Sequence, residues 1–495
     1  MSYLRFDKTL MTNLGDSLQK EVLRSNRSGA YACTTLVDCN TRKYHGLLVV
    51  PVPELDNENH VLLSSLDATV IQHGAEFNLG LHKYQGDNFS PRGHKYITDF
   101  EYTPCPTITY RVGGVILRKE ILWIHKRTQM MIRYTLVDAH SETTLRLRPF
   151  LAFRNKHELS KANMYANGRS YPVTNGVKNR LYDGFPWLHM QLSKADAKFV
   201  PAPDWYYDFE YQKELERGYE GYEDLLTTGY FEMNIKKGES IIFSASVDEM
   251  PSGEAIVEAY ETSVARRTHK IDFESCLHHS ARQFIIRRPG DRTEVMSGYP
   301  WYGKAGRSAF ISLPGLTLEQ GYKEDCMDVL DTMVGDMHNG DFAGKASAEV
   351  SADAPLWFFW TLQQLEEHIG AQAIWEKYGA AMKSILTAYR RGFFGGCVAM
   401  HTNGLVWAAR DGVALTWMDC VMDGQPVTPR AGYTVEINAL WYNAVSYALA
   451  LANKMGDKEF EKEWKALPEQ IKKSFVEMFY LTDEGYLVDF VDSYG

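Results

Sequence analysis

The chain has 495 residues, and at roughly 100 to 200 residues per domain this length predicts two to four domains. Its 53 basic and 63 acidic residues give a net charge of −10, which argues against nucleic acid or an anionic membrane surface as the main partner. The seven cysteines are scattered without CxxC pairs, so the sequence indicates neither a disulfide framework nor a zinc site.

The first residues do not form a secretory signal, because Asp7 and Lys8 stand where such a signal places its apolar stretch. No run reaches the 18 or so apolar residues of a membrane helix; the nearest, 439–452, is interrupted by Asn443 and Ser446. We therefore expect a soluble, cytoplasmic protein that does not associate with membranes.

Residues 28–250 have a hydrophobic period near two, with β-branched and aromatic residues, which is typical of strands. The expected strands lie within 44–52, 107–125, 130–138, 144–153, 229–235 and 239–247. Gly113 and Gly114 separate two alternating runs and predict a tight hairpin. Many strands without intervening helices favour an antiparallel β-sandwich, over which we expect 160–225 to form long loops.

After about residue 252 the period becomes that of helices. The expected helices are 316–337, 355–368, 374–389, 435–448 and 460–479. Pro355 suits the first turn of its helix. We expect an N-terminal β-sandwich domain over 1–250, a helical linker over 251–280 and a helical domain over 281–495.

Asp419 is the first candidate for chemistry. It lies two residues after Trp417 in an apolar context, where desolvation raises the pKa of a carboxyl group, as a general acid requires. Asp419 could equally cap a helix or pair with Arg430. Glu436 and Asn438 open a helix and could point into a cavity, or Thr434 could cap this helix with the acid near its dipole.

Two further segments combine aromatic and charged residues. The first, 299–307, contains Trp301, Tyr302 and Arg307, and could be a binding loop or simply a packed loop. The second begins with Asp353, most simply a helix cap, and continues with aromatic residues that suit a core. Since the histidines do not show the spacing of metal ligands, we expect neither a metal nor another cofactor.

Four segments of the chain resemble glycogen debranching enzymes of the prokaryotic type. The C-terminal match is LTWMDCVMDGQPVTPRAGYTVEINALWYNAV, and the N-terminal match is NRSGAYACTTLVDCNTRKYHGLLVV. The other two are SGYPWYGKAGRSAFISLPGLTL and SADAPLWFFWTL. The resemblance implies a β-sandwich followed by an (α/α)6 toroid, as in glucoamylase, and an amylo-α-1,6-glucosidase that releases glucose from branch stubs of glycogen or limit dextrin.

The resemblance also implies roles for individual residues in an inverting mechanism with two carboxyl groups. Asp419 would be the general acid. The residues expected to bind the substrate are Arg307, Trp301, Asp353, Trp417, Arg430, Glu436 and Asn438. The partner would be an α-glucan, while the oligomeric state is left open.

The chain departs from the family pattern in two places. Ala305 and Ser308 replace the Trp and Asp that normally flank the Gly-Arg pair, and Ser351 stands where Asn is usual. An Asp that accepts hydrogen bonds from sugar hydroxyls is not replaced in kind by Ser308, and each unmade bond to a buried polar group costs about 1–3 kcal/mol. The protein could therefore be a non-catalytic glucan-binding relative, or an enzyme that acts on another α-linked sugar.

The length of the helical part is a further departure from the family pattern. Residues 281–495 are fewer than the roughly 350 that twelve helices of ordinary length need, so we expect an incomplete toroid. The family's general base would then lie beyond Gly495. Asp489 and Asp492 are late carboxylates, but nothing in the sequence places them opposite Asp419.

Overall fold

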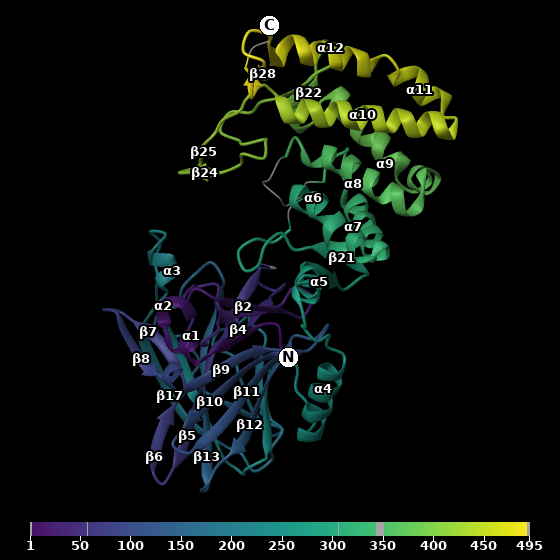
Figure 1. Cartoon of the computed structure of the whole chain (residues 1–495). Helices are drawn as coiled ribbons and strands as arrows, with labels where there is room; N and C mark the ends of the chain where they lie inside the picture. Colours follow the sequence, from purple (N-terminus) through teal and green to yellow (C-terminus); the bar gives the residue numbers. More distant parts are fainter. Residues whose placement is uncertain (1, 57, 305, 343–350, 493–495) are drawn as a thin grey trace. The chain divides into compact units, whose positions relative to one another are not determined.

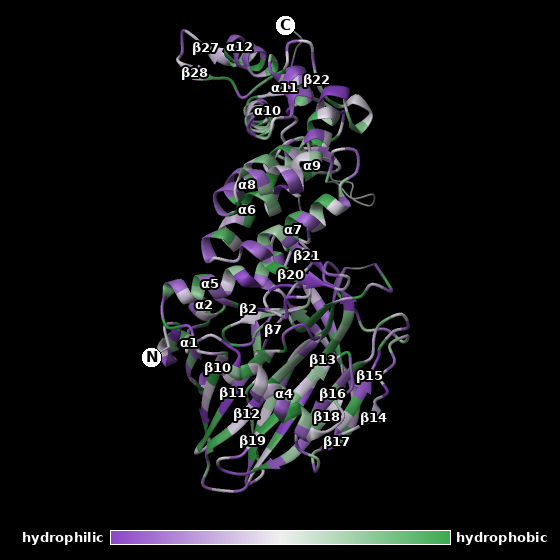
Figure 2. Cartoon of the chain, turned by 90° about the vertical axis from the view of Figure 1, so that its right-hand side faces the viewer, coloured by the Kyte–Doolittle hydropathy of each residue, from purple (hydrophilic) through white to green (hydrophobic). Residues whose placement is uncertain are grey.

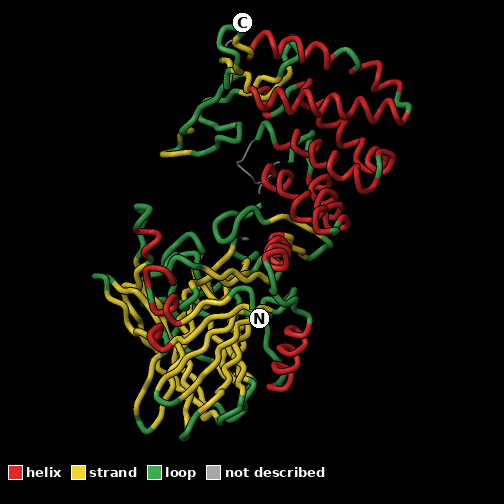
Figure 3. The backbone as a smooth tube through the Cα atoms, viewed as in Figure 1, coloured by secondary structure: helices red, strands yellow, loops and turns green. Residues whose placement is uncertain are grey.

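The computed structural model describes residues 2–56, 58–304, 306–342 and 351–492. It divides into two compact units, Met1–Arg287 with Gly298–Trp301, and Arg288–Ser297 with Tyr302–Gly495. Strands make up most of the first unit and helices most of the second (Figures 1 and 3). We describe each unit separately.

The first unit is built on two large antiparallel sheets. One has the order β1-β9-β10-β11-β12-β19-β16-β15-β14, and the other has the order β2-β3-β4-β5-β13-β18-β17-β7-β8 with β6 paired to β5. The strands of the first sheet are β1 (Arg5–Asp7), β9 (Ile97–Tyr102), β10 (Pro106–Val112), β11 (Val115–Trp123), β12 (Gln129–Asp138), β14 (Tyr171–Val173), β15 (Gly176–Asn179), β16 (Leu188–Leu192) and β19 (Ser240–Ser246). Those of the second sheet are β2 (Glu21–Ser25), β3 (Tyr31–Thr35), β4 (Gly46–Pro51), β5 (Asn59–Gln72), β6 (Ala75–Asn78), β7 (Leu81–Tyr84), β8 (Asn88–Arg92), β13 (Thr143–Asn155), β17 (Lys198–Glu210) and β18 (Tyr222–Ile235).

One hydrophobic core joins side chains from both sheets, including Leu117, Ile132, Leu145 and Phe231. Apolar and polar residues are interspersed along the strands (Figure 2), since successive side chains of a strand point to opposite faces. This arrangement confirms the antiparallel sandwich. The hairpin between β10 and β11 is also confirmed: Gly113 and Gly114 have φ of 56° and 81°, which glycine adopts without strain.

The expectation of long loops over 160–225 was wrong. This stretch contains β14, β15, β16, β17, the short helix α3 (Gln212–Leu215) and the start of β18. The reason is clearest in β17, where Pro201 and Pro203 interrupt the pattern of a strand and most side chains are exposed. Pairing with β18 nevertheless holds β17 extended, with irregularities in the register beside the prolines.

Helices α4 (Gly253–Ala265) and α5 (Phe273–Phe284) cover the region expected to be a helical linker, and both belong to the first unit. Ile256 and Tyr260 of α4 are buried and pack with Leu122 and Ile242 of the first sheet. Helix α4 therefore closes part of the outer face of that sheet. The short helices α1 (Lys8–Thr12) and α2 (Leu14–Ser17) precede β2.

The second unit is mainly helical. Its helices are α6 (Gly306–Thr317), α7 (Lys323–Asp336), α8 (Ala354–Ile369), α9 (Ala371–Arg391), α10 (Val435–Met455), α11 (Lys458–Trp464) and α12 (Leu467–Phe479). Helix α10 packs against α8, α9, α11 and α12. Its short strands are β21 (Arg292–Val295), β22 (Val398–Met400), β23 (Val406–Ala408), β24 (Val421–Met422), β25 (Gln425–Pro426), β26 (Tyr433–Thr434), β27 (Tyr480–Leu481), β28 (Tyr486–Leu487) and β29 (Phe490–Val491); β20 (Ile285–Arg288) spans the division between the units.

The predicted helices at 355–368, 374–389 and 435–448 are confirmed by α8, α9 and α10, with Pro355 in the first turn of α8. Two expected helices are each divided. Gly321, with φ of 76°, ends the turn before α7, and α12 begins at Leu467, next to Pro468, after a break at Lys465 and Ala466. Among the described residues no helix is both long and apolar enough to cross a membrane.

Candidate active site

Arg307 joins two carboxylates of the second unit. It is the second residue of α6 and donates from Nε to Asp353 Oδ2 at 2.8 Å and from Nη1 to Asp419 Oδ2 at 2.8 Å. Burial alone would lower the pKa of Arg307, but the carboxylates of Asp353 and Asp419 raise it. One guanidinium thus brings together three of the residues singled out in the sequence. We call Arg307, Ser351, Asp353 and Asp419 the arginine cluster.

Asp353 is the buried carboxylate of this cluster. Its side chain is 2% exposed, and its second oxygen accepts a hydrogen bond from Ser351 Oγ at 2.5 Å. Arg307 Nη2 in turn donates to Ser351 Oγ at 3.1 Å. Asp353 stands at the N-cap position of α8, but its side chain makes no capping hydrogen bond. Its two oxygens are therefore used to hold Arg307 and Ser351 rather than to cap the helix.

Asp419 is the exposed carboxylate of the cluster, with 60% of its side chain accessible. Only its Oδ2 contacts Arg307; Oδ1 has no partner in the part of the chain that the structure describes. Trp417 is also exposed, at 53%, in the same non-helical segment. Among the described residues Asp419 neither caps a helix nor pairs with Arg430, and the desolvation expected for it was wrong, because most of its side chain is accessible.

Arg430 is the centre of a second cluster. Its side chain is 1% exposed and donates to both oxygens of Glu436, at 2.6 and 2.7 Å, and to both oxygens of Asp489, at 2.8 and 2.6 Å. Asp489 is brought there because β29 pairs with β26, at the start of α10. Sequence spacing could not show this partner, since residues 430 and 489 are joined only through that pairing.

Asn438 is fully buried on α10. Its side chain accepts from Val406 N and donates to the carbonyls of Val406 and Thr434. These contacts tie β23 to the start of the helix. Thr434 occupies the N-cap position, but its hydroxyl makes no capping bond.

Trp301 lies in the first unit, where Arg42 Cζ is 5.1 Å from its ring. Its carbonyl accepts a hydrogen bond from Lys156 Nζ at 3.1 Å. Tyr302 belongs to the second unit and is 68% exposed.

Of the two residues that depart from the family pattern beside Arg307, Ser308 is exposed on α6 and Ala305 lies outside the described residues.

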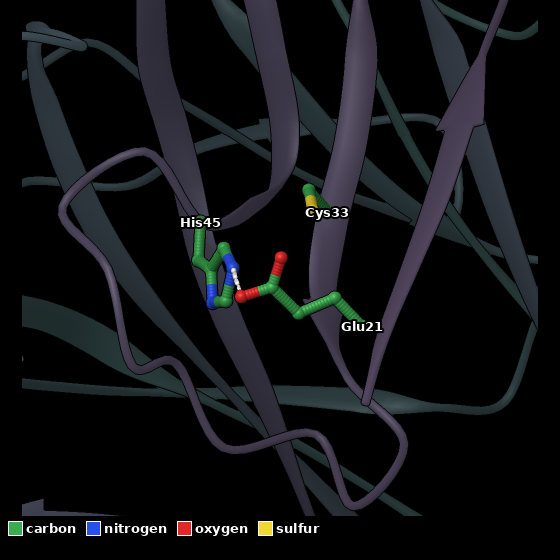
Figure 4. A group of neighbouring side chains, drawn as sticks. All are labelled: Glu21, Cys33 and His45. Carbon is green, nitrogen blue, oxygen red and sulfur yellow. Dashed lines mark ion pairs between the residues drawn. The ribbon is translucent and has the colours of Figure 1, made fainter. Parts of the chain in front are cut away.

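Within the described ranges, one group of side chains has the spacing of metal ligands: Glu21, Cys33 and His45 of the first unit, whose ligand atoms lie within 4.8 Å of one another (Figure 4). Thr41 N donates to His45 Nδ1 at 3.1 Å, so the proton of a neutral imidazole is on Nε2, which faces Glu21 at 3.4 Å. A metal ion can bind only to a ring nitrogen with a free lone pair, and on Nε2 the proton occupies that position.

The other two members of the group also oppose metal binding. Burial raises the pKa of the Cys33 thiol far above its ordinary value, whereas a metal ligand must be a thiolate. Burial alone would raise the pKa of Glu21, but His45 and Arg42 lower it to about 2. Glu21 is thus already paired with two protein groups. We interpret this group as a structural ion cluster that does not fit a metal.

A small cavity lies in the first unit. Its volume is about 20 Å³, and it is lined by Asp38, Ser65, Asp67 and Lys119 among others. This volume admits a water molecule but not a sugar ring. The candidate for chemistry is therefore the arginine cluster of the second unit.

Comparisons with known proteins identify the family of the chain. A model of the N-terminal part of glycogen debranching enzymes matches residues 20–242, and a model of amylo-α-1,6-glucosidase matches residues 279–495. No curated protein sequence matches the chain.

A solved structure of a bacterial glucoamylase complexed with acarbose is similar in fold. It aligns with a TM-score of 0.54 and 10% identity, over 96% of this chain and 70% of the glucoamylase. The similarity confirms the expected fold class, an antiparallel β-sandwich followed by a glucoamylase-like helical region. Since the two family models together span most of the sequence, the chain belongs to the glycogen debranching enzyme family.

Proposed function

We propose that the protein is a glycoside hydrolase that releases glucose from α-1,6 branch stubs of glycogen or limit dextrin, with Asp419 as general acid of an inverting reaction. Family membership supports a glycoside hydrolase of α-glucans. The observation that carries the finer proposal is the arginine cluster, in which Arg307 holds an exposed carboxylate and a buried one on the same guanidinium.

Asp419 is accessible to a leaving group, because most of its side chain is exposed and its Oδ1 has no partner among the described residues. In an inverting hydrolysis, the acid protonates the glycosidic oxygen while a second carboxylate, roughly 6.5–9.5 Å away, takes a proton from the attacking water. Asp353 is unsuited to that second role, since its oxygens are engaged by Arg307 and Ser351 and its side chain is buried. We assign it to positioning Arg307.

The other residues expected to bind the substrate differ in how exposed their side chains are, and exposure decides which of them could contact a sugar. Trp417 offers an exposed indole that could stack on a sugar ring. Both oxygens of Glu436 accept hydrogen bonds from Arg430. We therefore assign this pair to stabilising the loop before α10 rather than to direct contact with a sugar. Asn438 is buried and positions β23. Trp301 as a sugar contact remains an expectation from the resemblance.

The test is glucose release from glycogen limit dextrin, with the anomer identified by NMR. We expect β-glucose from the wild type and a loss of at least about 100-fold for Asp419→Asn, which is the usual effect of removing a general acid. Asp411→Asn is the matched control, because Asp411 is an exposed carboxylate outside the arginine cluster. Hydrolysis that survives in Asp419→Asn would remove Asp419 from this role.

A non-catalytic glucan-binding protein is the second candidate. Ser308, exposed beside Arg307, supplies one hydroxyl where the family pattern has a carboxylate. This candidate expects retention of the protein on glycogen without release of glucose. Wild-type hydrolysis that Asp419→Asn abolishes would exclude it.

A further inference from the structure

Three cations, two of them buried, lie in the region of Tyr102 in the first unit. Arg24 is on β2, Tyr102 ends β9, and Arg267 and Lys270 come from the connection between α4 and α5. Arg24 and Lys270 are 5% and 4% exposed. We call Arg24, Arg267 and Lys270 the basic cluster.

The aromatic ring is the main neighbour of two of these cations. Arg24 Cζ lies 3.6 Å and Lys270 Nζ lies 3.4 Å from the centre of the Tyr102 ring. The hydrogen bonds of the guanidinium groups go to backbone carbonyls: Arg24 Nη1 donates to Leu23 O at 2.7 Å, and Arg267 Nη2 donates to Trp123 O. All of these contacts are with uncharged groups.

No carboxylate forms an ion pair with Arg24, Arg267 or Lys270 within the described ranges, and Lys270 Nζ has no hydrogen-bond acceptor there. Arg24 Nη2 is buried and also has no hydrogen-bond partner. A cation–π contact offsets only part of the cost of removing a charged group from water, and several like charges placed together add to that cost. The basic cluster therefore lacks the negative charge that buried cations normally have.

The pKa of Lys270 agrees with the geometry of the basic cluster. Burial, Arg24 and Arg267 lower the pKa of Lys270 to about 7, and only the Cys276 thiol acts in the opposite direction. Lys119, a second buried lysine of the same unit, differs: its Nζ lies 2.6 Å from Asp38 Oδ2, and although burial alone would lower its pKa, Asp38 raises it. Lys156, another buried lysine without an ion pair among the described residues, donates to the carbonyls of Pro300 and Trp301, whereas Lys270 Nζ has neither a counter-charge nor a hydrogen-bond acceptor there.

We propose that the basic cluster binds a small oxyanion, namely phosphate, either free or as the monoester of a sugar. Guanidinium and ammonium groups donate charge-assisted hydrogen bonds to phosphate oxygens, and Arg24 Nη2 and Lys270 Nζ are the donors that have no other use. The ligand would be anionic, whereas an α-glucan is neutral, so this binding site is separate from the arginine cluster in its chemistry.

The test is thermal unfolding of the full chain in phosphate-free buffer, with inorganic phosphate, glucose 1-phosphate, glucose or sodium chloride added at matched ionic strength. We expect Tm to rise saturably with either phosphate compound and not with glucose or sodium chloride, because a ligand of the native state stabilises it. The compound that acts at the lower concentration identifies the source of the oxyanion. A wild type whose Tm responds equally to sodium chloride would overturn the proposal.

Variants separate binding from a purely structural role of the cations. Lys270→Met and Arg24→Met should raise Tm in phosphate-free buffer, because each removes an uncompensated charge, and should weaken phosphate binding by at least tenfold. Lys119→Met is the matched control: it leaves Asp38 unpaired, so it should lower Tm yet keep the response to phosphate. If Lys270→Met and Arg24→Met lower Tm, fail to fold or keep the full phosphate response, the cations serve the Tyr102 packing alone and the proposal is wrong.

Discussion

Arg307 Nη1 donates a hydrogen bond to Asp419 Oδ2 at 2.8 Å, while most of the Asp419 side chain stays exposed to solvent. The contact fixes the orientation of the carboxyl group while one oxygen stays available to a leaving group. A positioned acid needs this combination, because proton transfer requires hydrogen-bond reach in a defined direction. The same guanidinium is anchored by the buried Asp353, so the orientation of Asp419 depends on a contact below the surface.

Arg307→Met should destabilise the protein by about 3–5 kcal/mol, because it leaves the Asp353 carboxylate buried without a cation. Asp419→Asn should cost less than about 1 kcal/mol, since its ion pair is largely exposed. The free energies of unfolding can be measured by urea denaturation.

The double variant Arg307→Met with Asp353→Asn is the control for this prediction. Removing the carboxylate charge should restore part of the stability that Arg307→Met loses, giving a coupling of about 0.5–3 kcal/mol in the double-mutant cycle. Additive losses would mean that Asp353 does not depend on Arg307.

Trp417→Ala should reduce glucan binding and leave stability nearly unchanged, because the indole is 53% exposed and contributes little to the core. We expect KM for limit dextrin to rise several-fold with a smaller effect on kcat. Tyr442→Ala is the matched control, an exposed aromatic residue on α10 outside the arginine cluster. Equal effects of the two substitutions on KM would argue against a role of Trp417 in binding.

The sequence was sufficient to predict elements with regular patterns. The strands that meet at Gly113 and Gly114 and the helix beginning at Val435 have clear periods and turn residues. Strand β17 could not be predicted, because Pro201 and Pro203 remove backbone donors and its extended shape comes from the neighbouring β18. The residue pattern of a segment predicts its structure only where the pairing with neighbouring strands favours the same structure.

The candidate site was predictable as a set of residues but not as a set of contacts. Arg307 and Asp419 are 112 positions apart, and nothing in either segment indicates that they pair. Asp489, by contrast, received no role from the sequence, although it accepts two of the four hydrogen bonds that Arg430 donates to carboxylates. The basic cluster was missed for the same reason, since Arg24 and Lys270 meet only through the fold.

Arg430→Lys should lower the free energy of unfolding by about 1.5–3 kcal/mol, because an ammonium group cannot form two bidentate contacts with Glu436 and Asp489 at once. Asp489→Asn should cost less, since Asp489 is 56% exposed and Glu436 keeps its partner. Thermal and urea unfolding of both variants measure the difference. If Asp489→Asn loses more free energy of unfolding than Arg430→Lys, the Arg430–Asp489 contact is more important than we assign here.

Acid should destabilise the first unit through His279. Burial, Lys270, Arg24, Arg267 and Arg282 lower the pKa of His279 to about 3, whereas an unfolded histidine titrates near 6.5. Between these two values the unfolded chain binds a proton that the native protein excludes, so stability falls as the pH decreases from about 6.5 towards 3. The glutamine of His279→Gln does not bind a proton in the native or the unfolded state. The Tm of this variant should therefore fall less steeply over pH 6.5 to 4 than that of the wild type. The difference between the two curves isolates His279 from the other titrating groups, and parallel curves would show that His279 is accessible to protons in the native state.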